Sequence, residues 1–273
     1  MRVLWASDIH LDLAGEGTIR AFMRSIQLEK PDIVLLGGDI GAADALEMFL
    51  KRIESEIRRP IYFVLGNHDF YRGSIASVRK AVAALEMQSS QLHWLNNAGV
   101  VSLTAGTALI GHDSWGDGRN GDFERSDVIL NDFALIRELR TRTRRELLPI
   151  LNRLGDEAAA HFRKVLPAAL ASHSHVLLLT HVPPWREAAW HEGRPSTDDY
   201  QPFFSCKVSG DALVEIMREH PESRLTVLCG HTHGQGIAKV GPNITVYTAG
   251  ATYERPEIQK VFQVDRSGLL IPG

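Results

Sequence analysis

The chain has 273 residues, of which 44% are hydrophobic and 23% are charged. This composition is typical of globular proteins and is enough for one large α/β domain or two small ones. The formal net charge of −3 and the pI near 6.5 disfavour a general nucleic-acid binder, which normally carries a basic excess. The two cysteines, Cys206 and Cys229, form no disulfide framework or structural zinc motif.

The start of the sequence lacks the pattern of a signal peptide. No apolar run reaches the roughly 18 residues that a membrane-spanning helix needs. We therefore expect a cytoplasmic protein that has no membrane partner.

Short apolar runs alternate with helical stretches through the first ninety residues. VLWAS, DIVLLGG and PIYFVLG are continuous apolar runs, which are typical of strands buried on both faces. Residues 18–29 and 42–58, which lie between these runs, carry apolar residues at helical spacing, and a third helix is expected over about 73–89. This β-α-β-α-β order predicts parallel strands joined by crossover helices.

Strand patterns return after the third helix. LHWL, GVVSLT and TALIGH lie close together over residues 92–111, with tight turns at Asn96-Asn97 and Ala105-Gly106, and this spacing predicts antiparallel strands. Five further runs, HVLLLTH, LTVLCGH, GIAKV, ITVYTAG and QKVFQV, predict strands in the C-terminal part, with one helix at about 209–220.

The stretch 122–172 has a helical pattern and separates two strand-rich halves. We interpret residues 1–273 as a single domain in which 122–172 is a helical insertion near the mouth of the site. Several arginines surround the apolar residues of this stretch: Arg137, Arg140, Arg142, Arg144 and Arg145. The favoured interpretation is a solvated helical face; the alternative is a cap whose arginines meet an anionic substrate.

Five short polar motifs each follow directly on an apolar strand-like run. In an open parallel sheet, ligands bind beyond the carboxyl ends of the strands, so these motifs are expected to converge on one crevice. In an extended segment the side chains of residues i and i+2 point the same way, so a motif such as Asp8-Ile9-His10 can aim two donors at one point. The donors of these motifs are oxygen and imidazole nitrogen, which suit Mn, Fe, Zn or Ni. Glycines directly before the ligands allow sharp turns and close approach. The motifs are Asp8-Ile9-His10, Gly38-Asp39, Gly66-Asn67-His68-Asp69, His181, and Gly230-His231-Thr232-His233.

This ordered set, D-x-H, G-D, G-N-H-D, a lone histidine after a strand and G-H-x-H, resembles the signature of the calcineurin-like metallophosphoesterase superfamily. The resemblance covers residues 8–233. Together with the order of strands and helices, it predicts an α/β fold: a four-layer α/β/β/α sandwich of two mixed β-sheets flanked by helices.

The resemblance also implies a ligand set for two divalent metal ions. Asp8, His10 and His233 would bind the first ion, and Asp39 would bridge both. The remaining ligands implied for the second ion are Asn67, His181 and His231. A bridging carboxylate can hold two dications about 3.5–4 Å apart, the separation used for in-line displacement at phosphorus.

The implied function is metal-dependent hydrolysis of phosphomonoesters or phosphodiesters of small molecules or nucleotides. Water held between two ions becomes hydroxide near neutral pH and attacks phosphorus in line. His68 stands next to a ligand but is not one in the family, which makes it the candidate general acid or stabiliser of transition-state charge.

Some polar residues leave alternatives open. Asp39 alone could begin the helix expected at 42, and Asp69 could be a partner of the ligands or a helix cap. His112 and Asp113 follow the strand TALIG and could face the site. The histidines outside the motifs are interpreted as surface or core residues: His93, His161, His173, His175, His191 and His220.

The residue three positions after the bridging aspartate distinguishes the branches of the family. Phosphoprotein phosphatases carry an aspartate there and purple acid phosphatases carry a tyrosine ligand, whereas this chain has Ala42. A bacterial-type enzyme with a small anionic phosphoester substrate remains. Substrate contacts are expected from Tyr71, Arg72, Trp185 and Arg186, and also from His112 if it faces the site; Trp185 could stack on a base or sugar, or pack the loop against the core.

Two rival functions remain open. A nuclease acting on DNA or RNA ends would need a basic strip, which the acidic balance disfavours, so no stable nucleic-acid binding is expected. A non-catalytic scaffold of the same fold would have lost parts of the site, whereas every ligand position here carries a competent residue. The sequence does not indicate an oligomeric state.

Overall fold

The first sheet is formed by the N-terminal part of the chain and by its C-terminal strands. The computed structural model describes residues 1–141, 143–265, 268 and 270–272. β1 to β4 are parallel, and the antiparallel pairing of β13 with β1 makes the sheet mixed. The spatial order is β14 (Leu270–Pro272), β13 (Ile258–Val264), β1 (Arg2–Ala6), β2 (Ile33–Leu36), β3 (Ile61–Phe63) and β4 (Leu92–Trp94).

The second sheet is also mixed. Its four central strands are parallel, and β5 and β11 pair antiparallel at the two edges. The spatial order is β11 (Gly236–Lys239), β12 (Ile244–Thr248), β10 (Arg224–Cys229), β7 (His175–Thr180), β6 (Thr107–His112) and β5 (Val101–Ser102).

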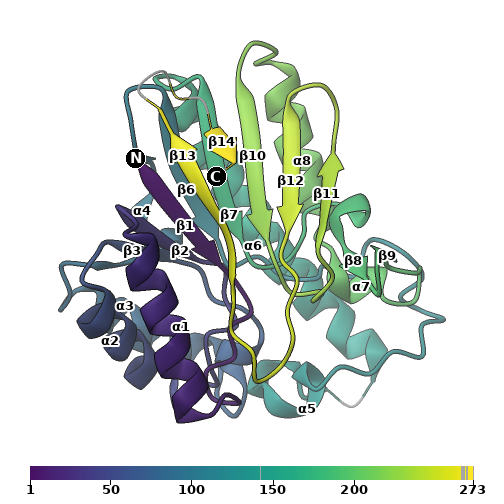
Figure 1. Cartoon of the computed structure of the whole chain (residues 1–273). Coiled ribbons are helices and arrows are strands. Elements are labelled where there is room, and N and C mark those ends of the chain that lie inside the picture. The colour runs from purple at the N-terminus through teal and green to yellow at the C-terminus, as the bar shows by residue number, and fades with distance from the viewer. Residues whose placement is uncertain (142, 266–267, 269, 273) are drawn as a thin grey trace.

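Helices cover the outer faces of the two sheets (Figure 1). Residues alternate between the faces of a strand, and β1 shows the consequence: Leu4 and Ala6 pack under the helices, whereas Val3 and Trp5 face the second sheet. The predicted four-layer α/β/β/α sandwich is confirmed. The helices on the first sheet are α1 (Glu16–Glu29), α2 (Leu46–Ile57) and α3 (Ile75–Glu86), and those on the second are α6 (Arg144–Leu170) and α8 (Lys207–Arg218).

The prediction of three antiparallel strands over residues 92–111 is wrong for the first of them. β4 pairs in parallel with β3 at the edge of the first sheet, with Ile61 opposite Leu92. Asn96 and Asn97 lie in a short helix, α4 (Leu95–Ala98), from which the chain passes to the second sheet. Of these three strands, only β5 and β6 form an antiparallel pair. The prediction failed for β4 because a local turn signal cannot specify the sheet that a strand joins.

The stretch 122–172 consists of two different parts rather than one insertion. From residue 144 onward it forms α6, which packs on β6, β7 and α8 and buries Phe162 and Leu166 in the core of the second sheet. The part before α6 is irregular and contains α5 (Asp132–Leu135) and the 3₁₀ turn η2 (Arg137–Leu139). Only this earlier part lies beside the candidate site described below.

The arginines of this stretch also differ from one another. Arg144 is half-buried and donates hydrogen bonds of 2.9 Å to the carbonyl oxygens of Phe123 and Val128. It therefore anchors the loop before α6, whereas Arg137, Arg140 and Arg145 are exposed, as a solvated face requires. Arg142 lies outside the described residues.

In the described part of the chain, no helix is both long and apolar enough to cross a membrane.

The loop over residues 184–206 contains only short elements. The loop elements are η3 (Arg186–Ala188), β8 (Trp190–His191), β9 (Arg194–Pro195) and α7 (Gln201–Phe204).

Candidate metal centre

The predicted ligands all lie just beyond the carboxyl ends of strands. Asp8 follows β1, Asp39 follows β2 and Asn67 follows β3, while His181 and His231 follow β7 and β10 of the second sheet. Parallel strands end at the same edge of a sheet, and the two sheets pack face to face, so loops from both meet at one place.

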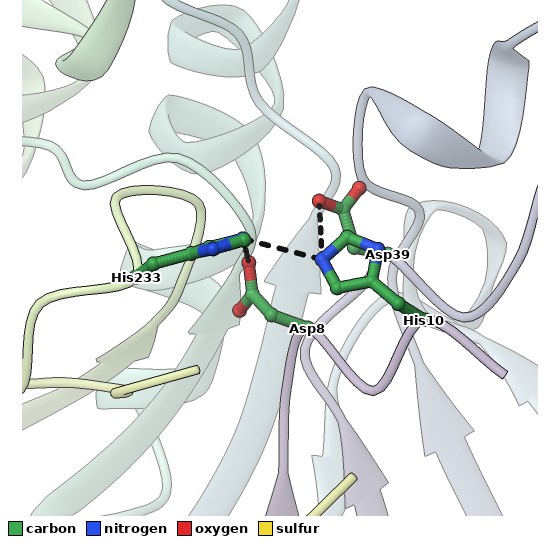
Figure 2. Close-up of side chains that lie close together, drawn as sticks. All are labelled: Asp8, His10, Asp39 and His233. Atoms are coloured by element: carbon green, nitrogen blue, oxygen red, sulfur yellow. Dashed lines mark hydrogen bonds and ion pairs between the residues drawn. The ribbon is translucent and has the colours of Figure 1, made fainter. Parts of the chain in front are cut away.

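One group of four side chains could hold a metal ion. Asp8, His10, Asp39 and His233 each offer one ligand atom, and these atoms lie within 4.8 Å of one another (Figure 2). The Nε2 atoms of His10 and His233 are 3.2 Å apart. The Nε2 of His10 lies 3.7 Å from Asp39 Oδ2, and that of His233 lies 3.6 Å from Asp8 Oδ1.

A second group surrounds the amide oxygen of Asn67. Its Oδ1 lies 3.1 Å from His181 Nε2 and 2.9 Å from His231 Nδ1. The other ring nitrogens face backbone carbonyls, His181 Nδ1 at 2.8 Å from the oxygen of Gly37 and His231 Nε2 at 3.0 Å from that of Phe203. A carbonyl only accepts, so in neutral rings the protons lie on those nitrogens, and the lone pairs point at the Asn67 oxygen.

Asp39 lies between the two groups. Its Oδ2 faces His10 at 3.7 Å, and its Oδ1 lies 3.4 Å from His181 Nε2. Its side chain is 1% exposed. One carboxylate thus presents an oxygen to each group, which is the position that a bridging ligand needs.

The electrostatics of the cluster fit cations. Burial, and then the charge of His233, lowers the pKa of His10 to about 3, and burial followed by His181 lowers that of His231 to about 3. Burial, and then the Asp8 carboxylate, raises the pKa of Asp39 well above its usual range.

In the described residues, the ion pairs of Asp8 and Asp39 are with histidines only. Buried carboxylates and converging imidazole lone pairs without a lysine or arginine partner form a donor set that fits divalent ions of borderline softness.

The backbone of the cluster is strained. Positive φ is uncommon for residues other than glycine and costs on the order of 1–3 kcal/mol per residue. Such strain concentrates at functional sites, and five of the seven predicted ligands carry it. They are Asp8 (φ 53°), His10 (φ 38°), Asp39 (φ 52°), His231 (φ 71°) and His233 (φ 58°).

Glycines before the ligands make room for the carboxylates. A Cβ on Gly66 would fall on the Asp39 carboxylate, and one on Gly230 would fall on that of Asp8. A side chain at either position would therefore displace a carboxylate of the predicted ligand set.

His68 lies at the edge of the centre, at the start of η1 (His68–Phe70). Its backbone N–H donates to Asp39 Oδ1 at 2.8 Å, and its ring stacks on Tyr71 with centroids 4.1 Å apart. Burial, and then the charge of His10, lowers the pKa of His68 to about 2. The ring of the metal-free protein is therefore neutral at pH 7 and carries one N–H that can donate.

Asp69 connects two ligand loops. Its Oδ1 accepts from the N–H groups of Ile40 and Gly41, at 2.7 and 2.9 Å, and its Oδ2 accepts from that of Gly66 at 2.8 Å. It is therefore a partner of the ligand loops and not a helix cap, because α3 is capped by Ser74. Asp39 is not a cap either, since α2 begins only at Leu46.

The structure does not bring four of the five predicted substrate residues to the centre. Trp185 is 9% exposed and packs in the core of the second sheet. His112 is buried beside His161, with ring centroids 5.0 Å apart. Arg72 and Arg186 are exposed and form ion pairs with Asp44 and Asp198. Core packing places Trp185 and His112, and local ion pairs hold Arg72 and Arg186. Of the five, only Tyr71 lines the cavity beside the centre.

A cavity of about 320 Å³ opens beside the candidate centre. Seven of its lining residues escaped prediction, because they lie in irregular segments or very short elements without a recognisable pattern. His191, interpreted from sequence as a surface or core residue, is among them. The seven are Ile129, Leu130, Asn131, Asp132, His191, Phe204 and Tyr253, which join the predicted Asn67, His68, Tyr71, His231 and His233.

The geometry and the comparisons with known proteins agree. The family model of the calcineurin-like phosphoesterases matches residues 1–235. The chain belongs to this family. It is therefore a metallophosphoesterase, of the kind that the five motifs indicate.

The sequence similarity to an individual curated protein covers a shorter part of the chain than the family model does. UDP-2,3-diacylglucosamine hydrolase of Shewanella sp. (strain ANA-3) is 34% identical over 84 residues, which is 27% of this chain and 35% of that protein. The chain thus matches about a third of the length of this curated relative.

Two solved structures share the fold. One is the phosphopantetheinyl hydrolase of Mycobacterium tuberculosis, with a TM-score of 0.64, 14% identity, and coverage of 93% of this chain and 90% of that one. The other is a dimetal phosphatase of Danio rerio, with a TM-score of 0.60, 14% identity, and coverage of 96% and 92%.

Proposed function

We propose that the chain is a dinuclear metal-dependent hydrolase of small-molecule phosphoesters. The observation that carries the proposal is the placement of Asp39, which faces one histidine group with each carboxylate oxygen. Asp8, His10 and His233 would hold one ion. The other would be held by Asn67, His181 and His231, and Asp39 would contact both. Mn, Fe, Zn and Ni all suit these donors.

The bound ions would supply a water nucleophile at neutral pH and neutralise charge on the phosphoryl oxygens. The chain's own residues fix the geometry. Backbone carbonyls orient the rings of His181 and His231, and Asp69 joins the loops that carry Asp39 and Asn67. This rigid frame limits the reorganisation that catalysis requires.

His68 is proposed to act on the leaving oxygen. It lines the cavity without belonging to either ligand group, and its ring is held between Tyr71 and His10. Its N–H can donate a hydrogen bond to the oxygen that gains charge as the ester bond breaks.

The cavity supports a small substrate whose organic part is uncharged and planar or apolar. Tyr71, Phe204 and Tyr253 supply aromatic surface, and Ile129 and Leu130 add apolar surface. Among the described residues, no lysine or arginine lines this cavity. A long anionic nucleic acid would find little charge complementarity here.

A substrate panel tests the proposal. The purified full chain, reconstituted with Mn²⁺, is assayed on p-nitrophenyl phosphate, bis-p-nitrophenyl phosphate, nucleoside mono- and diphosphates and single-stranded DNA. We expect metal-dependent hydrolysis of the small esters and loss of most activity in His68→Ala. Cleavage of DNA alone would favour the nuclease, and metal-independent hydrolysis would contradict the proposed centre.

A further inference from the structure

Asp132 lines the cavity beside the candidate centre and has no place in the proposed ligand set. It is the first residue of α5, in the irregular segment before α6, and it is 2% exposed. Its Oδ1 accepts hydrogen bonds from Asn67 Nδ2 at 2.8 Å and from the Tyr71 hydroxyl at 2.7 Å. Both donors are neutral side chains, so this buried carboxylate is held by hydrogen bonds rather than by an ion pair.

The contact with Asn67 decides which end of an amide faces the metal position. The two ends of an asparagine amide have nearly the same shape, and only the hydrogen bonds around them distinguish the oxygen from the nitrogen. Asp132 Oδ1 accepts from both the Tyr71 hydroxyl and Asn67 Nδ2, so the NH₂ end of the amide faces Asp132. The amide oxygen then points the other way, toward His181 Nε2 and His231 Nδ1.

We propose that Asp132 is a positioning residue that holds the Asn67 amide with its oxygen toward the second metal position. The inference rests on the proposed dinuclear centre. Without the carboxylate, the amide could rotate and present its NH₂ group, which is not a metal ligand. The Tyr71 hydroxyl donates to the same carboxylate oxygen, beside the bond from Asn67.

Metal binding, measured without substrate, tests this role. Partners of metal ligands are worth about 10–100-fold in metal affinity. In Asp132→Ala we expect Mn²⁺ affinity at the second position to fall by that factor, while the first position changes by less than about threefold. Asp132→Asn can still present a carbonyl oxygen to Asn67, so it should restore affinity to within about threefold. Calorimetry and metal analysis give both values.

Tyr71→Phe is the matched control. It removes the other donor to the same oxygen, together with the longer contact of 3.4 Å from Asn67 Nδ2 to the Tyr71 hydroxyl, but leaves the shorter bond between Asp132 and Asn67 intact. We expect second-site affinity within about threefold of the unmodified chain. A fall as large as in Asp132→Ala would show that the whole segment, and not the amide contact, is responsible, and would overturn the inference.

Exchanging the side chains of Asn67 and Asp132 tests the positioning role even if Asp132→Ala fails to fold. In Asn67→Asp two carboxylates face each other, whereas adding Asp132→Asn restores a donor and acceptor pair with an oxygen still toward the metal. We expect Asp132→Asn to raise second-site affinity about tenfold or more in this background and to leave it nearly unchanged otherwise.

Equal effects of Asp132→Asn in both backgrounds contradict the inference. The unmodified chain reports separately on the proposed function, through its own two-ion stoichiometry and hydrolysis.

Discussion

The two halves of the candidate centre differ in how firmly their imidazoles are held. In the half that contains Asn67, the rings of His181 and His231 are both fixed by backbone carbonyls. In the other half, the Nδ1 of His10 has no hydrogen-bond partner among the described residues, and the side chain of His233 is 20% exposed. The rings of His181 and His231 are therefore oriented before metal binds, whereas those of His10 and His233 are freer to adjust.

This difference has an energetic consequence. A ligand that is already oriented loses little conformational entropy on binding and so contributes more of its interaction energy to affinity. We therefore expect the half with Asn67 to depend strongly on each side chain and the half with His10 to tolerate change better. The following predictions test this comparison.

The largest effect is expected from Asp39→Ala, because Asp39 faces both halves. It should reduce both metal affinities and lower hydrolysis by more than about a hundredfold, the range typical for loss of one group that stabilises a transition state. Metal analysis and kcat/KM are the measurements. Asp44→Ala is the matched control, since Asp44 is exposed and its ion pair within the described residues is with Arg72. Near-normal binding of two ions in Asp39→Ala would exclude a bridging role.

A smaller effect separates the two halves. Partners of metal ligands alone change affinity about 10–100-fold, so His181→Ala should reduce affinity at the second position by more than about a hundredfold. His233→Ala should reduce affinity at the first position by about tenfold less, because a more exposed ring contributes less. Competition with a fluorescent chelator measures both. Equal losses would remove the distinction between a rigid and an adjustable half.

The smallest effect concerns stability, at a histidine outside the centre. Burial, and then His161, lowers the pKa of His112 well below its ordinary value of 6.5. The unfolded chain therefore binds the proton more readily than the folded chain. The stabilising contribution is present above about pH 6.5 and is lost as the pH falls below that value.

His112 Nδ1 accepts from the N–H of Ser114 at 3.0 Å, and Asn can supply the same acceptor without titrating. His112→Asn should therefore lose less Tm between pH 7 and pH 5 than the unmodified chain. Thermal melts across this range are the measurement, with the half-buried His220 changed to Asn as control. An unchanged pH slope would show that other groups dominate the acid sensitivity.

The sequence predicted the centre better than its surroundings. Asp8, Asp39 and Asn67 each follow a buried strand of the β-α-β-α-β unit, whose strands run parallel and end at one edge of the sheet, so their convergence could be expected. The roles of these residues as metal ligands, and of His68 in catalysis, remain predictions. Trp185 and Arg186 illustrate the limit: they follow the strand that precedes His181, yet one packs in the core and the other pairs with Asp198.

By itself, the sequence determined the strands, the crossover helices and which side chains stand at the strand ends, because hydrophobic periodicity and short motifs are local properties. Tertiary structure alone decided that β4 joins the first sheet, that residues 144–170 cover the second, and that Asp132 and Tyr253 lie beside the centre. These placements depend on contacts between residues far apart in the chain, which a local pattern does not encode.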